Sequence, residues 1–166
     1  MEEIIKALPK RAKDKENENK KFFAKLRAKP PKNLDYMMQE LHEQEFQVTD
    51  CLSCANCCKT TGPLFTAKDI SRISKRFKMK EFDFIQQYLR IDEDNDYVLQ
   101  QTPCVFLGAD NYCSIYEYRP KACREFPHTG RKKFQQISKL TLENVKMCPA
   151  AFNIVEALKE SVAKGK

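Results

Sequence analysis

The stretch that decides the fold is CLSCANCC at residues 51–58, in which four cysteines are spaced C-x2-C-x2-C-C. Two thiols separated by two residues can reach one metal centre from a single tight turn. Four further cysteines follow one at a time along the chain. The predicted metal ligands are therefore Cys51, Cys54, Cys57, Cys58, Cys104, Cys113, Cys123 and Cys148.

The composition is that of a globular chain that keeps its thiols reduced. Of its 166 residues, 42% are hydrophobic and 32% are charged, which suits a folded domain. No apolar run approaches the roughly 20 residues of a membrane span, and the acidic start resembles no signal peptide. We therefore expect a cytoplasmic protein with no membrane partner. In that compartment eight thiols favour metal ligands over disulfides, which need oxidising conditions.

Thiolates are soft ligands that select zinc, iron–sulfur clusters or copper(I) over hard cations. Cys51, Cys54 and Cys57, together with Cys148 before Pro149, partly match the ferredoxin pattern C-x2-C-x2-C with a distant Cys-Pro ligand. Cys58 interrupts that match. The ligand types leave an iron–sulfur cluster and Zn²⁺ both open as the cofactor.

The adjacent Cys57 and Cys58 bear on how many centres there are. Neighbouring side chains diverge in regular structure, so both reach one metal only where the backbone bends. Eight thiolates divide more simply into two centres of four. One centre with additional redox-active or buried cysteines stays open, as does His128 as a substitute ligand.

A β-hairpin is predicted for residues 104–107 and 112–116, separated by a Gly-Ala-Asp-Asn turn. With the turn centred on Gly108 and Ala109, Cys104 faces Cys113 across the pair. Directly opposed residues have Cβ atoms roughly 5 Å apart on the same face. That arrangement suits two thiolates on one metal site.

The remaining pattern is mostly helical. Helices are expected over residues 2–28, where Pro9 is a candidate interruption, from Asn33 onward, after a capping box at 66–69, and after Cys148-Pro149. Residues 97–99 form a short strand, and residues 92–96 an acidic turn that lacks the glycine of a calcium loop. We therefore predict an α+β fold, mainly α-helical with a small β-hairpin, organised around a cysteine-ligated metal centre. Residues 1–47 form a helical arm and a packing helix, and residues 48–166 form the metal-binding domain with a C-terminal helix.

The net charge of +7 is concentrated near the C-terminus, where residues 128–166 carry 8 basic and 3 acidic side chains. Nucleic-acid binding there needs aromatic side chains on which bases can stack, and only Phe134 and Phe152 are close in sequence. We interpret this third as a solvated basic face and do not expect a nucleic-acid partner. A protein partner and the oligomeric state stay open.

The combined motifs resemble the YkgJ-like, or CxxCxxCC, family of zinc- or iron-chelating domains. The match rests on CLSCANCCKTTGP at 51–63, PCVFL at 103–107, YCSIYEYRPKACREFP at 112–127 and CP at 148–149. The resemblance implies a bacterial-type cytoplasmic protein with an iron–sulfur or zinc centre held by the eight cysteines. Flagellin lysine methylases are similar in having a related cysteine cluster, but no glycine-rich nucleotide loop is present here.

Three functions are consistent with the sequence. The first is a metal-binding protein whose iron–sulfur or zinc centre has a redox, metal-handling or accessory role, with Arg119 and Arg124 near the single cysteines as supporting charges. The second is an enzyme of protein modification that uses the metal centre, although no known catalytic motif is visible. The third is a zinc-stabilised module that binds nucleic acid or protein through its basic C-terminal third.

Overall fold

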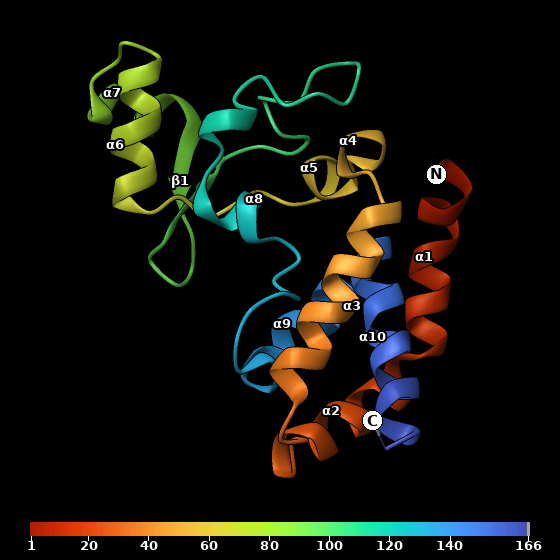
Figure 1. Ribbon diagram of the computed structural model, residues 1–166. Coiled ribbons are helices and arrows are strands. Elements are labelled where there is room, and N and C mark those ends of the chain that lie inside the picture. The colour runs from red at the N-terminus through yellow and green to blue at the C-terminus, as the bar shows by residue number, and fades with distance from the viewer. Residues whose placement is uncertain (166) are drawn as a thin grey trace. The chain divides into compact units, whose positions relative to one another are not determined.

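The computed structural model describes residues 1–165, which divide into two compact units (Figure 1). Unit 1 comprises residues 1–54 and 127–165, and unit 2 comprises residues 55–126. The boundary predicted between residues 47 and 48 separates the N-terminal helices from the metal-binding domain. It is a different kind of division from these two units, and it stays a prediction. Lys166, at the end of that predicted domain, lies outside the described residues.

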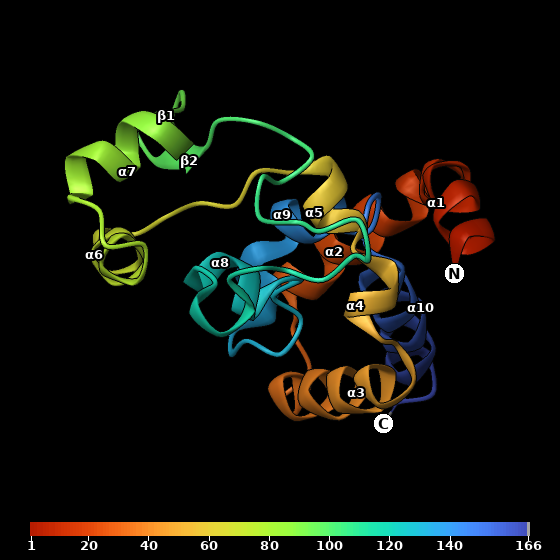
Figure 2. The ribbon, with the colours of Figure 1, turned by 90° about the horizontal axis from the view of Figure 1, so that it is seen from above.

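Unit 1 is built from helices that pack around the C-terminal helix. They are α1 (Glu2–Asp14), α2 (Glu16–Ala28), α3 (Leu34–Val48), α4 (Cys51–Cys54), the 3-10 helix η2 (Phe134–Ile137), α9 (Ser138–Asn144) and α10 (Pro149–Ala163). Helices α3 and α10 run side by side (Figures 1 and 2). Ile154, Val155 and Leu158 of α10 are fully buried or nearly so, which explains the apolar stripe in its sequence.

The helix expected over residues 2–28 is divided, but the break falls at Lys15 and Pro9 lies inside α1. The ammonium group of Lys15 pairs with Glu18 at 2.9 Å and with Glu156 of α10 at 3.7 Å. Lys159 of α10 pairs with Glu18 and donates to the buried Asn19 at 3.0 Å. These bonds fasten the junction of α1 and α2 to α10, so the N-terminal helices form part of the core of unit 1.

Unit 2 combines short helices with one strand pair. Its elements are α5 (Asn56–Thr60), α6 (Ala67–Arg76), α7 (Glu81–Tyr88), β1 (Leu89–Ile91), β2 (Tyr97–Leu99), the 3-10 helix η1 (Tyr116–Tyr118) and α8 (Lys121–Glu125). Strands β1 and β2 are antiparallel, with Arg90 opposite Val98. The carboxylate of Asp92 accepts the backbone N–H groups of Asp94 and Asp96, each at 3.0 Å, and so shapes the acidic turn between them.

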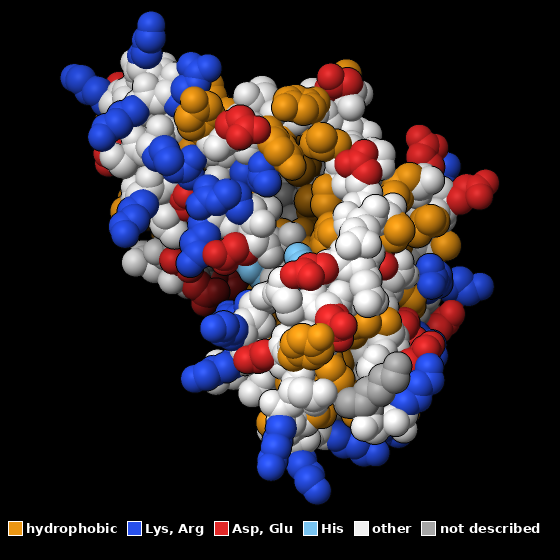
Figure 3. Space-filling view, in the orientation of Figure 1, with side chains coloured by type: hydrophobic (Ala, Val, Ile, Leu, Met, Phe, Trp, Pro, Cys, Tyr) orange, Lys and Arg blue, Asp and Glu red, His pale blue; other side chains and the backbone are white. Residues whose placement is uncertain are grey.

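The surface of unit 2 is unevenly charged. Lys and Arg side chains crowd over the region that α6 and α8 occupy in Figure 1 (Figure 3). Over residues 55–126 the chain carries 11 basic and 10 acidic side chains, so this crowding reflects how the charges are placed in space.

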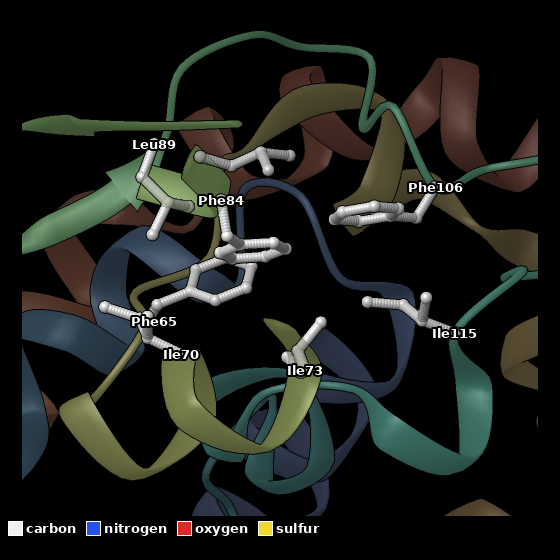
Figure 4. Packing of buried hydrophobic residues seen from close by; sticks show 8 residues of the cluster. Phe65, Ile70, Ile73, Phe84, Leu89, Phe106 and Ile115 are labelled. Atoms are coloured by element: carbon white, nitrogen blue, oxygen red, sulfur yellow. The ribbon is translucent and has the colours of Figure 1, made fainter. Parts of the chain in front are cut away.

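A hydrophobic cluster holds unit 2 together (Figure 4). Its buried members are Phe65, Ile70, Ile73, Phe84, Leu89, Leu99, Phe106 and Ile115. Helix α6 contributes Ile70 and Ile73 because its N-terminus is fixed by the predicted capping box, in which Thr66 and Asp69 exchange side-chain and backbone bonds. Cys104 and Cys113 pack against the edge of this cluster, so the core positions two of the predicted ligands.

The mainly α-helical fold with one small antiparallel strand pair confirms the predicted fold class. The strand pair lies at residues 89–99, however, and not at the predicted hairpin. In the described part of the chain no helix is both long enough and apolar enough to cross a membrane.

Candidate metal centre

The CLSCANCC run is divided between two one-turn helices by a backbone bend at Ala55. Ala55 has a left-handed φ of 47°, a conformation that disfavours continuation of a helix. The carboxylate of Asp50 accepts the N–H groups of Leu52 at 2.9 Å and Ser53 at 3.2 Å, which starts α4. The bend places the first two cysteines of the run in unit 1 and the last two, Cys57 and Cys58, in unit 2.

Unit 2 brings together four thiols from distant parts of its sequence. The backbone N–H of Cys104 donates to the carbonyl of Cys58 at 2.7 Å, which joins α5 to the loop after β2. The negative charges on Cys58, Cys104 and Cys113 each raise the pKa of Cys123. Cys58 likewise acts on Cys104 and Cys113. The four side chains therefore form one electrostatic group, which we call the unit 2 thiols.

Their pKa values differ because their surroundings differ. Burial raises the pKa of Cys123 to about 12 and that of Cys104 to about 11, and it also raises the pKa of Cys113. Hydrogen bonding with Cys57, whose sulfur lies 3.9 Å from that of Cys58, lowers the pKa of Cys58 to about 7. Cys58 is thus the thiol of this group that ionises near neutral pH, whereas the other three stay protonated there.

Cys104 and Cys113 are not directly opposed, so the predicted hairpin register is wrong. Within residues 1–165, the only β-bridge in this loop is antiparallel and pairs Leu107 with Cys113. The turn is wider than predicted, because Gly108 donates to the carbonyl of Tyr112 at 2.8 Å and Asn111 has a left-handed φ of 65°. The carboxylate of Asp110 accepts the N–H of Tyr112 at 3.0 Å and stabilises this turn.

Backbone groups beside two of these thiols favour their ionised forms, and the sequence does not show this. Phe106 and Leu107 lower the pKa of Cys104 through their backbone, and Ile115 lowers that of Cys113. Such interactions stabilise thiolates and tune metal centres. They depend on the loop conformation, so no side-chain pattern in the sequence signals them.

Of the two predicted supporting arginines, the structure brings Arg119 to the thiols. Its positive charge lowers the pKa values of Cys113 and Cys123. The guanidinium stacks over the ring of Tyr116, 3.7 Å from the centroid, and donates to the carbonyl of Tyr116 at 2.8 Å. Arg124 instead donates to the carbonyl of Arg119 at 2.5 Å, so it supports the backbone beside Arg119.

Unit 1 gathers three cysteines, which we call the unit 1 thiols: Cys51, Cys54 and Cys148. Cys148 is the N-cap of α10, where its sulfur accepts the N–H of Ala151 at 3.4 Å and Pro149 occupies the first turn. Burial raises the pKa of Cys148 to about 12, and the charges on Cys51 and Cys54 add to this increase. Cys54 and Cys148 are buried, whereas Cys51 is exposed.

The two histidines occupy unit 1. His42 shares a 2.8 Å hydrogen bond between its Nδ1 and the hydroxyl of Thr129, and its ring packs against Phe46. Burial lowers the pKa of His42. His128 has a left-handed φ of 67°, and its role as a substitute ligand stays an open alternative.

The donor set fits a soft metal. None of the eight cysteines forms a disulfide within residues 1–165. Over the same residues, no group of three or more histidine, cysteine, aspartate or glutamate side chains is arranged to hold a metal ion as it stands. Thiols that are buried or half-buried, two of them near an arginine, remain the ligand type that zinc and iron select.

Comparison with known proteins identifies the class. Residues 50–148 match the model of the CxxCxxCC family, described as a putative zinc- or iron-chelating domain. The matched segment covers more than half of the chain and contains all eight cysteines, from Cys51 to Cys148. The chain belongs to this family, and it is a metal-binding protein whose cofactor is zinc or iron. No curated protein and no solved structure matches it.

Proposed function

We propose that the chain holds its metal through all eight cysteines and that the unit 2 thiols form one four-thiolate centre. The observation that carries this proposal is the electrostatic grouping of Cys58, Cys104, Cys113 and Cys123 inside one compact unit. The unit 1 thiols form the second group, and the eighth ligand, Cys57, lies beside Cys58. The association of Cys57 with Cys51, Cys54 and Cys148 stays a prediction.

A four-thiolate centre is saturated, and this limits its chemistry. Zinc with four protein ligands holds a fold together, whereas catalytic zinc keeps an open position. An iron–sulfur cluster with four thiolates transfers electrons or senses oxidants. The unit 2 centre therefore supports a redox or accessory role if it contains iron, and a structural role if it contains zinc.

The surroundings support either metal. Zn²⁺ with four thiolates has a net charge of about −2, and oxidised four-iron clusters have a similar net charge. Arg119 provides a positive charge near Cys113 and Cys123, and the backbone beside Cys104 and Cys113 also favours their ionised forms. An electron-transfer role gains most from these groups because they set the reduction potential.

The enzyme alternative receives less support. A reaction at the metal needs a free coordination position and a substrate pocket beside it. A cavity of about 250 Å³ lies in unit 1 near Ala12, Asn19 and Leu142, and no cysteine is among its lining residues. The alternative of an interaction module acting through the basic C-terminal third rests on charge alone.

The deciding experiment is anaerobic purification followed by analysis for zinc, iron and acid-labile sulfide and by visible absorption. A brown protein containing iron and sulfide indicates a cluster, and a colourless protein with about two zinc ions per chain indicates structural sites. Cys123→Ser should remove one centre, and the matched Cys148→Ser variant should remove the other. A metal-free, disulfide-linked protein would refute both metals.

Proton release provides a second test, because thiols must ionise to bind metal. At pH 8 the three unit 2 thiols with raised pKa values are protonated, whereas Cys58, with a pKa of about 7, is mostly ionised. Loading this centre should therefore release about three protons at pH 8 and about four at pH 6. Calorimetric titration of the Cys148→Ser variant with the metal, in buffers of different ionisation enthalpy, measures the number of protons released. Release of fewer than two protons contradicts the ligand assignment.

A further inference from the structure

Helix α6 presents one strongly basic side to solvent. Lys68, Arg72, Lys75 and Arg76 follow one another at helical spacing, whereas Ile70 and Ile73 are buried on the opposite side. Residues four and seven or eight apart lie on one face of a helix. The four charges therefore form a stripe along α6, with Lys75 and Arg76 exposed and Arg72 half-buried.

A second set of basic side chains lies beside this stripe, in residues 119–124. The guanidinium of Arg72 donates to the carbonyls of Tyr118 at 2.7 Å and Arg119 at 3.2 Å. The carboxylate of Asp69 accepts the backbone N–H of Lys121 at 3.1 Å. We call the combined surface the basic face: Lys68, Arg72, Lys75, Arg76, Arg119, Lys121 and Arg124 (Figure 3).

Few acidic groups offset this charge. Residues 68–76 and 117–125 carry seven basic and three acidic side chains, for a net charge of +4. Of the three acids, Asp69 is buried and pairs with Arg72 at 2.7 Å, and Glu125 pairs with Lys121 at 3.6 Å. Most other acids of unit 2 lie in α7 or in the turn between β1 and β2. The near-neutral total of unit 2 thus conceals a basic face.

Tyrosine rings accompany the arginines. Arg76 lies over the ring of Tyr118 at 5.3 Å from its centroid, and Tyr118 is 39% exposed. The ring of Tyr116, beneath Arg119, lies 5.9 Å from the ring of Tyr112, centroid to centroid. Tyr112 is 48% exposed. Proteins that bind single strands combine basic side chains along the phosphate backbone with aromatic rings and arginines on which bases stack.

We propose that the basic face of unit 2 binds single-stranded nucleic acid. Lysine and arginine side chains contact the phosphates, and bases stack on Tyr118 and Tyr112. An acidic protein is the competing partner, because tyrosine and arginine also anchor protein interfaces. Half-exposed tyrosine rings beside a row of lysine and arginine side chains favour a ligand that offers both phosphates and bases. The sequence alone does not predict a nucleic-acid partner. Its net positive charge lies in the C-terminal third, and too few aromatic residues lie near that charge for bases to stack on.

The test is fluorescence anisotropy of a labelled 20-nucleotide oligothymidine titrated with the metal-loaded protein at several salt concentrations. The face variant is Lys75→Gln/Arg76→Gln/Lys121→Gln. The control, Arg131→Gln/Lys132→Gln/Lys133→Gln, removes the same charge from exposed residues of unit 1. Each phosphate contact on a single strand contributes about 0.7 to the slope of log K against log salt. The face variant should lower that slope by about 2 and the affinity about tenfold, whereas the control changes affinity less than twofold.

Tyr118→Ala separates base stacking from general charge attraction. Loss of one stacked base weakens binding about tenfold, while binding of poly-glutamate should not change. The proposal fails if the wild type does not bind at 50 mM salt, if the control triple weakens binding as much as the face triple, or if poly-glutamate competes equally and Tyr118→Ala has no effect. The last result would assign the face to an acidic protein.

Metal content and helicity are measured for every variant. If the face triple loses either, the single variant Lys75→Gln replaces it, since Lys75 is exposed; its expected slope change is about 0.7, and no change would refute the proposal. The proposal is independent of which metal the thiols hold.

Discussion

Both units carry cysteines, but they position them by different means. In unit 1, Cys148 caps the 15-residue helix α10, and the neighbouring helices bury a continuous core. In unit 2, Cys58 lies on a five-residue helix, and Cys104 and Cys113 lie in a loop that has one isolated bridge. Regular helices stabilise the first arrangement, whereas the second depends on a small hydrophobic cluster and a few loop bonds.

The difference teaches where the metal matters most for folding. Small scaffolds with little regular structure usually need a metal or disulfides in addition to their core. Unit 2 contains one pair of three-residue strands and, in α6, its longest helix of only 10 residues. Metal binding should therefore supply folding free energy in unit 2, while unit 1 is held mainly by its helices.

The largest effect is expected from removing a ligand of unit 2. Cys123→Ser should abolish the proposed four-thiolate centre and unfold unit 2 locally, because a structural metal site contributes on the order of 10 kcal/mol. Hydrogen exchange should show lost protection in α6 and α7 and retained protection in α3 and α10. In Cys51→Ser, the matched unit 1 variant, α6 and α7 should stay protected. Equal loss of protection in both variants would end the distinction between the units.

The next effect comes from the two hydrophobic cores. Phe84 of unit 2 and Phe23 of unit 1 are both almost fully buried, so replacing either by alanine should cost about 3–5 kcal/mol. Only Phe84→Ala should also speed metal release from the unit 2 centre to a chelator, because Cys104 and Cys113 pack on its cluster. Chelation kinetics in a Cys148→Ser background measure this. Faster release with Phe23→Ala would contradict the separation.

A smaller effect is expected from Asp69, which joins α6 to α8. Its carboxylate accepts bonds from Thr66, Arg72 and the N–H of Lys121. Asp69→Asn keeps the shape but loses the charge, and should cost about 1–3 kcal/mol in chemical unfolding at pH 7.

The same carboxylate gives a pH dependence. Burial alone would raise the pKa of Asp69, but the bonds from Thr66, Arg72 and Lys121 lower it overall. A lowered pKa contributes stability that is present above the unfolded value and lost as pH falls through the folded value. The stability difference between wild type and Asp69→Asn should therefore shrink as pH falls below about 4. Metal loss in acid is common to both proteins, and a difference that is constant with pH would exclude the role of the charge.

The elements that the sequence predicts well depend on local signals. The capping box at Thr66 and the helix after Cys148-Pro149 are set by residues within a few positions of each other, and both are confirmed. The strand at residues 97–99 and the acidic turn before it are likewise local. Spacing also predicts which cysteines are candidate ligands, because C-x2-C patterns are short.

What the sequence could not predict depends on distant or conformational effects. The register of the loop around Cys113 is set by the Asp110 side chain and by the left-handed Asn111, and alternation of residue types carries neither. The grouping of Cys58 with Cys104 needs a backbone bond across 46 positions. The basic face cannot be seen in the net charge of unit 2, because acidic residues elsewhere in the unit balance its basic residues.

The smallest effect tests whether unit 1 is independent of the metal in unit 2. Thr129 is fully buried and shares its hydroxyl with His42, so Thr129→Val should cost about 1 kcal/mol, whereas Thr129→Ser should restore most of it. Burial lowers the pKa of His42, so its neutral form contributes stability above the unfolded pKa of about 6.5 that is lost as pH falls through the folded value. The rate of metal release from the unit 2 centre should be unchanged in Thr129→Val. An accelerated release would show that the helical core of unit 1 also stabilises that centre.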